Sequence, residues 1–309
     1  MGSNIQTKVA LIGGGPACAT AAIQLNRSGV DITLIAKEIG GSIRNANLVE
    51  NLLGFPEGIK GLDFVNLIKT QLLNNKIPYI NEKVESVEYS ESRYKIKTTS
   101  KEILSEHIII GTGSIPKKLN IKGEKKAFEL NKLYYEVYNV KNLSRNKSML
   151  IIGSGDVAYD YAMSLIKSAE SVSIIQRTSK TKSLPILQKR VESQNKIRVV
   201  KNREPVEIIS ENNTVTLLTK MQKRIIPMEA DIILVAIGRE PNIQFLSDEL
   251  KALNKTPRKS STIYFVGDAK EGNYRHVSIA MGDGMNVAME IVKKLSEKED
   301  YNGTTRQIW

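Results

Sequence analysis

Short apolar runs alternate with glycine turns and amphipathic segments along this chain, and the same order of elements occurs twice. The first copy begins with an apolar strand at residues 8–12, followed by a glycine turn, a helix and a second strand at residues 31–35. The second copy begins with a strand at residues 149–152 and continues in the same order to a strand at residues 171–175. Each copy therefore predicts a βαβ unit.

The later elements of the two copies also match. Each copy continues with a predicted hairpin, at residues 83–98 in the first and 206–219 in the second, and then with a buried strand. These buried strands, at residues 107–110 and 231–237, are almost entirely apolar, as in parallel sheets that are covered on both faces. The sequence predicts an α/β fold of two doubly wound, Rossmann-like domains.

The chain returns to a strand after the second copy, at residues 262–266, and then to a helix of small and apolar residues from about residue 278 to 295. We expect this tail to rejoin the first domain, so that the second domain is an insertion into the first. The predicted domains comprise residues 1–115 with 241–309, and residues 116–240.

Both glycine turns match the first two positions of the pattern G-x-G-x-x-G. Gly13 and Gly15 fill them in the first copy and Gly153 and Gly155 in the second, with Cys18 at the third position of the first copy. Such a turn lets the backbone approach a pyrophosphate, and the following helix N-terminus offers free amide N–H groups. One turn alone could be purely structural, but two in matching contexts favour two dinucleotide sites.

The end of the second strand indicates which nucleotide binds. An acidic residue there binds the ribose diol of NAD, whereas basic residues accommodate the 2′-phosphate of NADP. In the second copy this strand runs into residues 176–182, which contain Arg177, Lys180 and Lys182 and no carboxylate. The sequence therefore indicates NADP, and the alternative is a solvated basic loop in an already basic chain.

Length and charge restrict the remaining function classes. The chain has 309 residues, enough for two hydrophobic cores, and a net charge of +12. A basic surface can attract an acidic partner, although a solvated lysine-rich surface without a single partner is equally open. No nucleic-acid-binding motif and no apolar run of membrane-spanning length occurs. No signal peptide pattern precedes the first strand, so we expect a cytoplasmic protein.

Further motifs follow one another along nearly the whole chain. They lie at residues 13–17 (Gly-Gly-Gly-Pro-Ala), 40–41 (Gly-Gly), 49–61 (Val-Glu-Asn-Leu-Leu-Gly-Phe-Pro-Glu-Gly-Ile-Lys-Gly), 111–113 (Gly-Thr-Gly), 236–242 (Ala-Ile-Gly-Arg-Glu-Pro-Asn), 266–268 (Val-Gly-Asp) and 274–275 (Tyr-Arg). Together they resemble the low-molecular-weight thioredoxin reductase type of pyridine nucleotide-disulfide oxidoreductase. The resemblance implies FAD on the first domain, NADP(H) on the inserted domain, and a homodimer.

The resemblance also implies which residues contact the cofactors. The residues that it assigns to FAD are Gly13, Gly15, Pro16, Ala17, Gly40, Gly41, Asn51, Val84, Thr112, Gly113, Gly267, Asp268, Arg275, His276 and Val277. The residues that it assigns to NADP(H) are Gly153, Gly155, Asp156, Val157, Arg177, Lys182 and Gly238. No metal site is expected.

This sequence departs from the family at the redox-active Cys-x-x-Cys and the aspartate that follows it. Counted back from Gly153 without a gap, these positions fall on Glu136, Asn139 and Val140. Cys18 is the only cysteine, which excludes an intrachain disulfide. A dithiol relay needs two thiols that exchange through a mixed disulfide. We therefore expect NADPH to reduce the flavin, but no relay through protein thiols.

The electron acceptor is the open question at this stage. Proteins that look like thioredoxin reductases without the cysteines include NADP reductases of ferredoxin or flavodoxin, and the basic charge suits an acidic carrier. One alternative is a reductase or oxidase of a small molecule, namely quinone, dioxygen or a low-molecular-weight disulfide attacked by Cys18. Another is a protein that senses nucleotides without turnover.

We make separate predictions for two residues, Cys18 and Trp309. Cys18 lies at a helix N-terminus, which lowers the pKa of a thiol. In relatives that use a lone cysteine in this turn, that cysteine directly follows the proline, whereas here Ala17 intervenes and rotates Cys18 by about 100° around the helix. We therefore expect Cys18 to be buried packing. Trp309, the last residue, either stacks on the flavin or forms a frayed terminus.

Overall fold

The protein is described by a computed structural model, which places residues 5–211, 214–255, 262–270, 272 and 274–301. Trp309 lies outside these ranges. The chain divides into two compact units: unit 1 comprises residues 1–44, 50–114 and 241–309, and unit 2 comprises residues 45–49 and 115–240. Residues 45–49 therefore group with unit 2, whereas the sequence placed them in the first domain.

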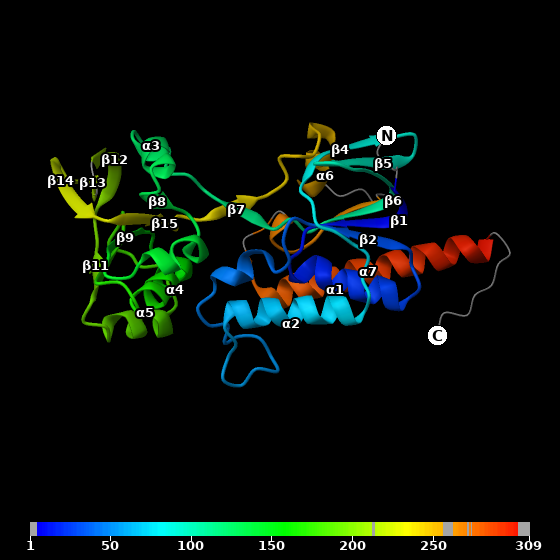
Figure 1. Ribbon diagram of the computed structural model, residues 1–309, viewed down its shortest axis with the longest axis horizontal. Helices are drawn as coiled ribbons and strands as arrows, with labels where there is room; N and C mark the ends of the chain where they lie inside the picture. The colour runs from blue at the N-terminus through cyan, green and yellow to red at the C-terminus, as the bar shows by residue number, and fades with distance from the viewer. Residues whose placement is uncertain (1–4, 212–213, 256–261, 271, 273, 302–309) are drawn as a thin grey trace. The chain divides into compact units, whose positions relative to one another are not determined.

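Unit 1 is built on a seven-stranded sheet (Figure 1). Its parallel strands are β3 (Tyr79–Ile80), β2 (Ile32–Ile35), β1 (Ile5–Ile12), β6 (Glu102–Ile110) and β17 (Ile263–Phe265), in that spatial order. The hairpin of β4 (Val84–Ser90) and β5 (Arg93–Thr98) pairs antiparallel with the first half of β6. β17 pairs with the second half of β6, so the C-terminal segment belongs to the core of unit 1.

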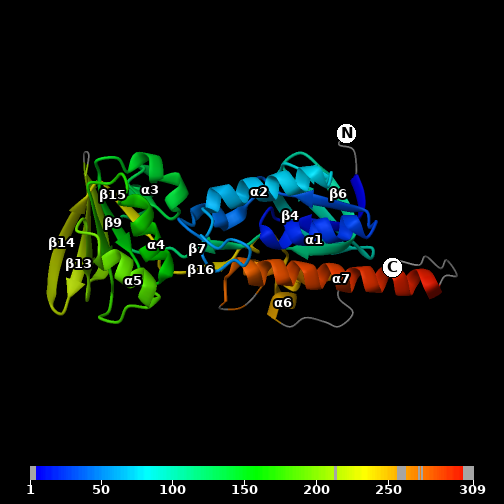
Figure 2. The same ribbon diagram turned by 90° about the horizontal axis from the view of Figure 1, so that it is seen from below.

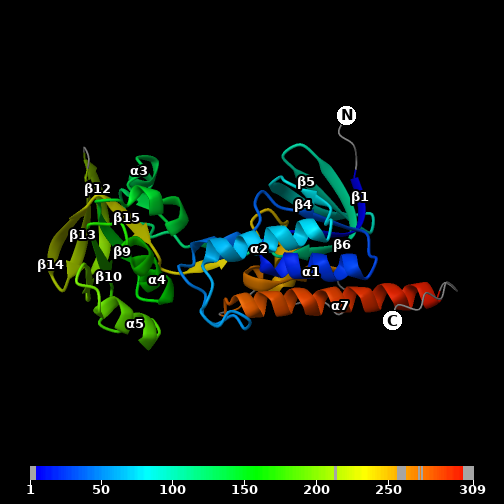
Figure 3. The same cartoon turned by 60° about the horizontal axis from the view of Figure 1, so that its bottom comes forward.

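Three helices cover one face of this sheet. They are α1 (Pro16–Arg27), α2 (Gly61–Asn74) and α7 (Val277–Tyr301), and Figures 2 and 3 show α1 between the other two. The absence of a side chain at Gly284 brings α7 close to α1, because a Cβ there would overlap the carbonyl oxygen of Ala17. On the other face, core residues of β1, β6 and the hairpin pack with Leu250 of α6 (Asp248–Lys255). The sheet is thus covered on both faces.

Unit 2 contains a five-stranded parallel sheet with covered faces. The strands, in spatial order, are β11 (Ile197–Val200), β10 (Ser171–Ile175), β9 (Ser148–Ile152), β15 (Ile232–Val235) and β8 (Leu133–Tyr134). Alternate residues of β9 point to opposite faces, as the period of a strand requires. Met149 and Ile151 pack towards α4 (Asp156–Leu165), whereas Leu150 and Ile152 pack towards β12 (Glu204–Glu211) and β13 (Thr214–Met221).

The remaining elements of unit 2 lie around this sheet. α5 (Pro185–Glu192) packs beside α4, and α3 (Glu124–Glu129) lies next to β12. Short 3-10 turns lie at Gly41–Asn45, Val137–Asn139, Lys141–Leu143 and Gly267–Ala269. β7 (Ser114–Pro116) and β16 (Arg239–Pro241) pair with each other where the chain passes from one unit to the other.

The α/β fold predicted from the sequence is confirmed, with differences in detail. The second hairpin is a three-stranded sheet, because β14 (Arg224–Ala230) pairs with β13. β14 is an edge strand that contains Pro227 and mostly exposed side chains, so its sequence lacks the apolar pattern of a strand. α7 extends to Tyr301, six residues beyond its predicted end. In the described part of the chain, no helix combines the length and hydropathy needed to cross a membrane.

Candidate functional site

The first glycine turn has a closed side and an open side. Gly13 has φ +122°, and a Cβ on it would overlap the backbone of Gly111, so this position requires glycine. Gly15 precedes α1 with φ −80°, and a Cβ there would meet no atom within 4 Å. Pro16 opens the helix, and no side chain caps it. The open side therefore presents uncapped backbone N–H groups to an anion, as pyrophosphate binding requires.

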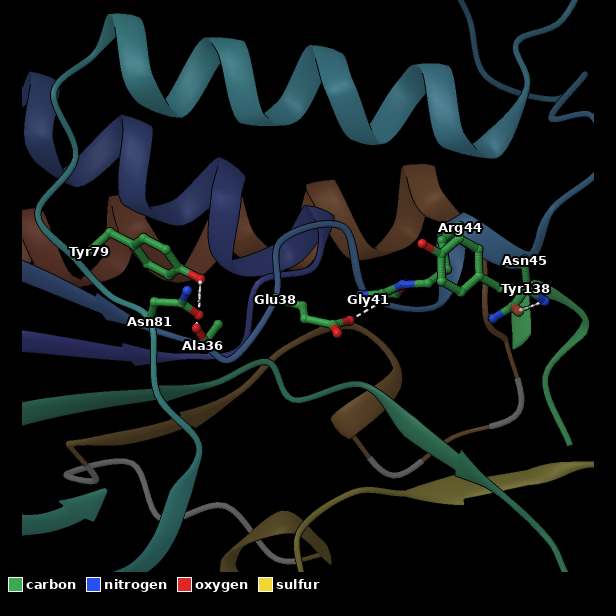
Figure 4. Close-up of polar contacts among 8 residues, drawn as sticks. All are labelled: Ala36, Glu38, Gly41, Arg44, Asn45, Tyr79, Asn81 and Tyr138. Atoms are coloured by element: carbon green, nitrogen blue, oxygen red, sulfur yellow. Dashed lines mark hydrogen bonds and ion pairs between the residues drawn. The ribbon is translucent and has the colours of Figure 1, made fainter. Parts of the chain in front are cut away.

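The loop after β2 lies directly on this turn. Gly40 donates its N–H to the carbonyl oxygen of Gly14 at 2.7 Å, and both Gly40 and Gly41 have positive φ angles of 111° and 59°. Glu38 in this loop forms an ion pair with Arg44, whose Nε donates to the carbonyl oxygen of Gly41 at 2.9 Å (Figure 4). Glu38 lies three residues beyond the end of β2, and its carboxylate is of the kind that binds a ribose diol. Sequence reasoning missed Glu38, although the rule applied to residues 176–182 would have found it.

Residues far apart in sequence meet at the carboxyl ends of β6 and β17. Thr112 donates its hydroxyl to the carbonyl oxygen of Asn242 at 2.6 Å, and Ser114 donates to Asp268 at 3.1 Å. Gly267 has φ +60°, and a Cβ there would press against Ala17 and Ala280. Gly113 also has a positive φ, of 70°. The sequence-predicted residues of this edge are therefore brought together beside the first glycine turn.

The segment before α7 carries two further predicted residues. His276 Nδ1 lies 3.3 Å from Asn51 Nδ2, so two predicted FAD contacts are neighbours. Arg275 Nε is buried and has no hydrogen-bond partner among the described residues, which fits a ligand that supplies an acceptor there. Val277 is the first residue of α7. Val84 differs from these, because its side chain is buried in the core of unit 1.

The second glycine turn repeats the geometry of the first. A Cβ at Gly153 would overlap the carbonyl oxygen of Ala236, whereas a Cβ at Gly155 would meet no atom within 4 Å. Asp156 is the first residue of α4 and accepts the N–H of Leu184 at 2.7 Å. Val157 is 43% exposed beside the open side. The turn therefore presents a second uncapped helix N-terminus.

The predicted NADP residues occupy different places around this turn. Arg177 and Lys182 are exposed, and the N–H of Lys182 donates to the carbonyl oxygen of Ser154 at 2.8 Å. Gln176, at the end of β10, is completely buried. Gly238 has φ +120° and accepts the N–H of Lys117 at 3.0 Å, so it lies at the crossing between the units. The cationic loop is thus attached to the glycine turn, while Gly238 belongs to the connection.

Glu136, Asn139 and Val140, which the sequence comparison with the family pointed to, lie in different surroundings. Glu136 forms an ion pair with Arg239 at 2.8 Å and accepts the hydroxyl of Tyr161 at 3.2 Å. Burial, followed by the adjacent Glu136 carboxylate, raises the pKa of Tyr161. Asn139 is exposed and Val140 is completely buried. Glu136 therefore takes part in an ion pair, Val140 in apolar packing and Asn139 in neither.

Cys18 is a packing residue, as predicted. Its side chain is completely buried, and Sγ lies 3.5 Å from the carbonyl oxygen of Ile12. Burial raises the pKa of the Cys18 thiol to about 12 and outweighs the backbone N–H of Gly111 that favours the thiolate. At neutral pH the thiol is therefore protonated and inaccessible.

Unit 2 contains a buried carboxyl group that sequence reasoning missed. Asp160 of α4 accepts the backbone N–H of Asn47 at 2.9 Å. Burial raises the pKa of Asp160 to about 6, against the opposing effects of the Asn47 N–H and Lys167. Asn45 accepts the N–H of Tyr138 at 3.1 Å (Figure 4), which helps to explain why residues 45–49 group with unit 2.

Comparison with known proteins gives a consistent answer over almost the whole chain. The family model "Pyridine nucleotide-disulphide oxidoreductase" matches residues 7–284. Thioredoxin reductase 2 of Arabidopsis thaliana is 30% identical, over 96% of this chain and 84% of that protein. The structure of Lactococcus lactis thioredoxin reductase is 26% identical with a TM-score of 0.83, over 94% of this chain and 99% of that one. A bacillithiol disulfide reductase of Staphylococcus aureus shares the fold at 18% identity, with a TM-score of 0.77 over 94% and 99%.

Proposed function

Because this chain belongs to the pyridine nucleotide-disulphide oxidoreductase family, we propose that it is an NADPH-dependent FAD enzyme that delivers electrons to a separate carrier without a dithiol of its own. Thioredoxin reductases of this family use FAD and NADPH. FAD, when bound, supplies the conversion between hydride transfer and single-electron transfer. The protein supplies binding sites, orientation and electrostatics.

Unit 1 is the proposed FAD site. The open side of Gly15 and the N-terminus of α1 hold the pyrophosphate, and Glu38 accepts the hydroxyl groups of the adenosine ribose. Arg275 completes the site, because its buried Nε lacks an acceptor among the described residues. His276 and Asn51 act as a pair, since they contact each other.

Unit 2 is the proposed NADPH site. Gly155 and the N-terminus of α4 hold the pyrophosphate, and Arg177 and Lys182 bind the 2′-phosphate. Asp156 positions the start of the following segment through the N–H of Leu184. The two sites thus use the same backbone geometry for different nucleotides.

The observation that carries the proposal is the state of the single cysteine. Reduction of a protein disulfide by a dithiol relay needs two thiols within reach of each other. This chain has Cys18 alone, it is buried, and burial raises the pKa of its thiol to about 12. These facts favour direct electron transfer from the flavin, and they disfavour attack of Cys18 on a low-molecular-weight disulfide.

A one-electron carrier of ferredoxin or flavodoxin type is the proposed acceptor. Such carriers are acidic, and the net charge of +12 favours their approach by long-range attraction. A dimer of this chain is also proposed, in line with the family resemblance. Leu67 and Leu73 of α2 and Met285 and Met289 of α7 are exposed apolar side chains that a second copy would cover. Light scattering after size exclusion measures the mass, and a monomer at micromolar concentration rejects the dimer.

Anaerobic stopped-flow spectroscopy tests the function. The flavoprotein is reduced with NADPH and then mixed separately with oxidised ferredoxin, flavodoxin, thioredoxin, a low-molecular-weight disulfide and a quinone. We expect rapid reoxidation by ferredoxin or flavodoxin, at a rate that falls as salt rises. Rapid reoxidation by thioredoxin, the small disulfide or quinone alone rejects a ferredoxin- or flavodoxin-type carrier as the acceptor. If NADPH does not bleach the flavin absorbance, the proposed NADPH-dependent enzyme is rejected and a nucleotide-sensing protein is supported.

A further inference from the structure

Gln176 directly follows β10, at the position where a nucleotide-binding strand presents its acidic residue, but its side chain is withdrawn from the surface. It is completely buried. Its Nε2 donates to the hydroxyl of Tyr159 at 2.9 Å, and its Oε1 accepts the hydroxyl of Thr181 at 3.1 Å. A buried amide with both ends hydrogen-bonded offers no acceptor to a ligand at the surface.

The two partners of Gln176 lie on the two segments that build the nucleotide site. Tyr159 belongs to α4, which follows the second glycine turn, and Thr181 belongs to the loop that carries Arg177, Lys180 and Lys182. The Gln176 backbone is fixed as well, because its N–H donates to the carbonyl oxygen of Val200 at 2.9 Å and its carbonyl oxygen accepts the N–H of Arg203, also at 2.9 Å. Gln176 therefore connects helix, loop and neighbouring strand.

Two backbone contacts hold the same loop from its far end. The N–H of Lys182 donates to the carbonyl oxygen of Ser154 in the glycine turn at 2.8 Å, and the N–H of Leu184 donates to Asp156 at 2.7 Å. With the Thr181–Gln176 bond, the loop is attached at three successive points. The side chains of Arg177, Lys180 and Lys182 are nevertheless exposed. The backbone of the loop is therefore held in place while its charged groups remain accessible to a phosphate.

We propose that Gln176 is a positioning residue that sets the preference for a 2′-phosphorylated dinucleotide over its 2′-hydroxyl counterpart. This proposal rests on the proposed function, in which unit 2 binds NADPH. The buried amide acts in two ways. First, no carboxylate is present to bind the hydroxyl groups of a ribose diol. Second, the amide holds the backbone of the cationic loop in place, so that less conformational freedom is lost when the loop binds a phosphate.

Thr181→Val tests this role of Gln176 without disturbing the core. Valine keeps the shape of threonine but removes the hydroxyl that donates to Gln176 Oε1, so the loop loses the first of its three attachments. Isothermal titration measures affinity for adenosine 2′,5′-bisphosphate and for adenosine 5′-phosphate as separate probes. We expect the first affinity to fall by about 3- to 10-fold and the second to stay unchanged, since one net hydrogen bond is lost.

Thr178→Val is the matched control. Thr178 lies in the same loop, is exposed, and donates only to the carbonyl oxygen of Lys180 at 3.4 Å. It should leave both affinities unchanged, and Thr181→Ser, which restores the hydroxyl, should recover wild-type binding. Gln176→Met removes both amide bonds and should reduce the preference at least as much as Thr181→Val. If it fails to fold, Thr181→Val alone decides.

The outcomes separate the two levels of the proposal. A wild-type protein that binds both probes equally rejects the NADPH assignment of unit 2 and, with it, the role of Gln176. A wild-type protein that prefers the 2′-phosphate, with a Thr181→Val variant that keeps the same ratio of affinities, rejects only the role of Gln176. An equal loss in Thr178→Val and Thr181→Val also rejects it, because the effect then belongs to the loop in general.

Discussion

The strand that follows the glycine turn ends in opposite ways in the two units. In unit 1 the segment after β2 reaches Glu38, a largely exposed carboxylate that pairs with Arg44 (Figure 4). In unit 2 the strand β10 is followed directly by Gln176, which is buried, and then by three cations. The turns themselves are alike, since Gly13 and Gly153 are closed against backbone and Gly15 and Gly155 face open space.

This difference shows that recognition of the pyrophosphate and recognition of the ribose belong to different parts of each site. The turn and its helix N-terminus recognise a pyrophosphate, which FAD and NADPH share. The end of the next strand recognises the ribose, free in the adenosine of FAD and phosphorylated in NADPH. Substitutions in the turns should therefore affect the two units alike, whereas substitutions at the strand ends should affect them differently.

Gly13→Val should have the largest effect. Its side chain would overlap the backbone of Gly111, and φ +122° is unfavourable for any residue with a Cβ, so we expect unit 1 to lose at least about 3 kcal/mol and its flavin. Gly15→Ala is the control, because its Cβ meets no atom within 4 Å and its φ is ordinary. Thermal melting and flavin absorbance measure both. Equal stability losses in the two variants would contradict the description of Gly13 as closely packed and Gly15 as facing open space.

Lys182→Glu should affect unit 2 alone. Reversing one charge in the cationic loop should weaken NADPH binding by about 100-fold, in the range of about 2–3 kcal/mol for charged hydrogen bonds, with FAD binding unchanged. Lys189→Glu, an exposed substitution on α5, controls for net charge. Fluorescence titration of NADPH at two salt concentrations gives the affinities. A comparable loss in both variants would show that only overall charge matters.

Asp160→Asn should stabilise unit 2 in a pH-dependent way. The pKa of about 6 in the folded protein lies above the ordinary 3.8, so the folded state binds the proton more tightly than the unfolded state. The wild-type carboxyl therefore does not destabilise the folded protein below about pH 4, destabilises it increasingly between pH 4 and 6, and costs about 3 kcal/mol above pH 6. We expect Asp160→Asn to match wild type at pH 4 and to exceed its stability at pH 8.

Urea unfolding monitored at both pH values tests this expectation, with Glu192→Gln on α5 as an exposed control. The Asn47 N–H keeps an acceptor in the variant, because the asparagine carbonyl takes the place of the carboxylate oxygen. A stability difference that is the same at pH 4 and pH 8 would reject an elevated pKa for Asp160.

Glu136→Gln should have a smaller effect on unit 2. The half-buried ion pair with Arg239 becomes a neutral contact, and we expect a loss of about 1–2 kcal/mol. Glu129→Gln is the matched control, because its ion pair with Lys125 is highly exposed and should contribute little. The midpoint of urea unfolding followed in unit 2 measures both losses. If electron transfer disappears while stability is retained, Glu136 has a chemical role that packing does not explain.

Cys18→Ala should have the smallest effect. Ala158 occupies the matching third position in unit 2, so the substitution makes the two turns more alike. We expect a stability loss of about 1 kcal/mol from the small cavity and unchanged rates of flavin reduction and reoxidation. The native thiol should not react with a thiol reagent at pH 8, since its pKa is about 12. Fast labelling of the native protein, or loss of turnover in the variant, would restore Cys18 as a reactive group.

Local patterns were sufficient for much of this protein. The repeated order of strand, glycine turn, helix and strand predicted two βαβ units, because each depends on residues close in sequence. The lone cysteine excluded an intrachain disulfide by count alone. The basic residues 177–182 indicated a phosphate, and the position of Cys18 two residues after Pro16 predicted a buried side chain, which the structure confirms.

Only the tertiary structure decided features that join distant segments. The Glu136–Arg239 ion pair spans 103 residues and the Asn47–Asp160 bond spans 113, and no local pattern encodes such a distance. The withdrawal of Gln176 from the surface required Tyr159 and Thr181 on opposite sides of it. The sequence by itself thus determined which elements form and which chemistry is absent. Burial and pairing, which depend on how these elements pack, decided which polar groups are free to bind.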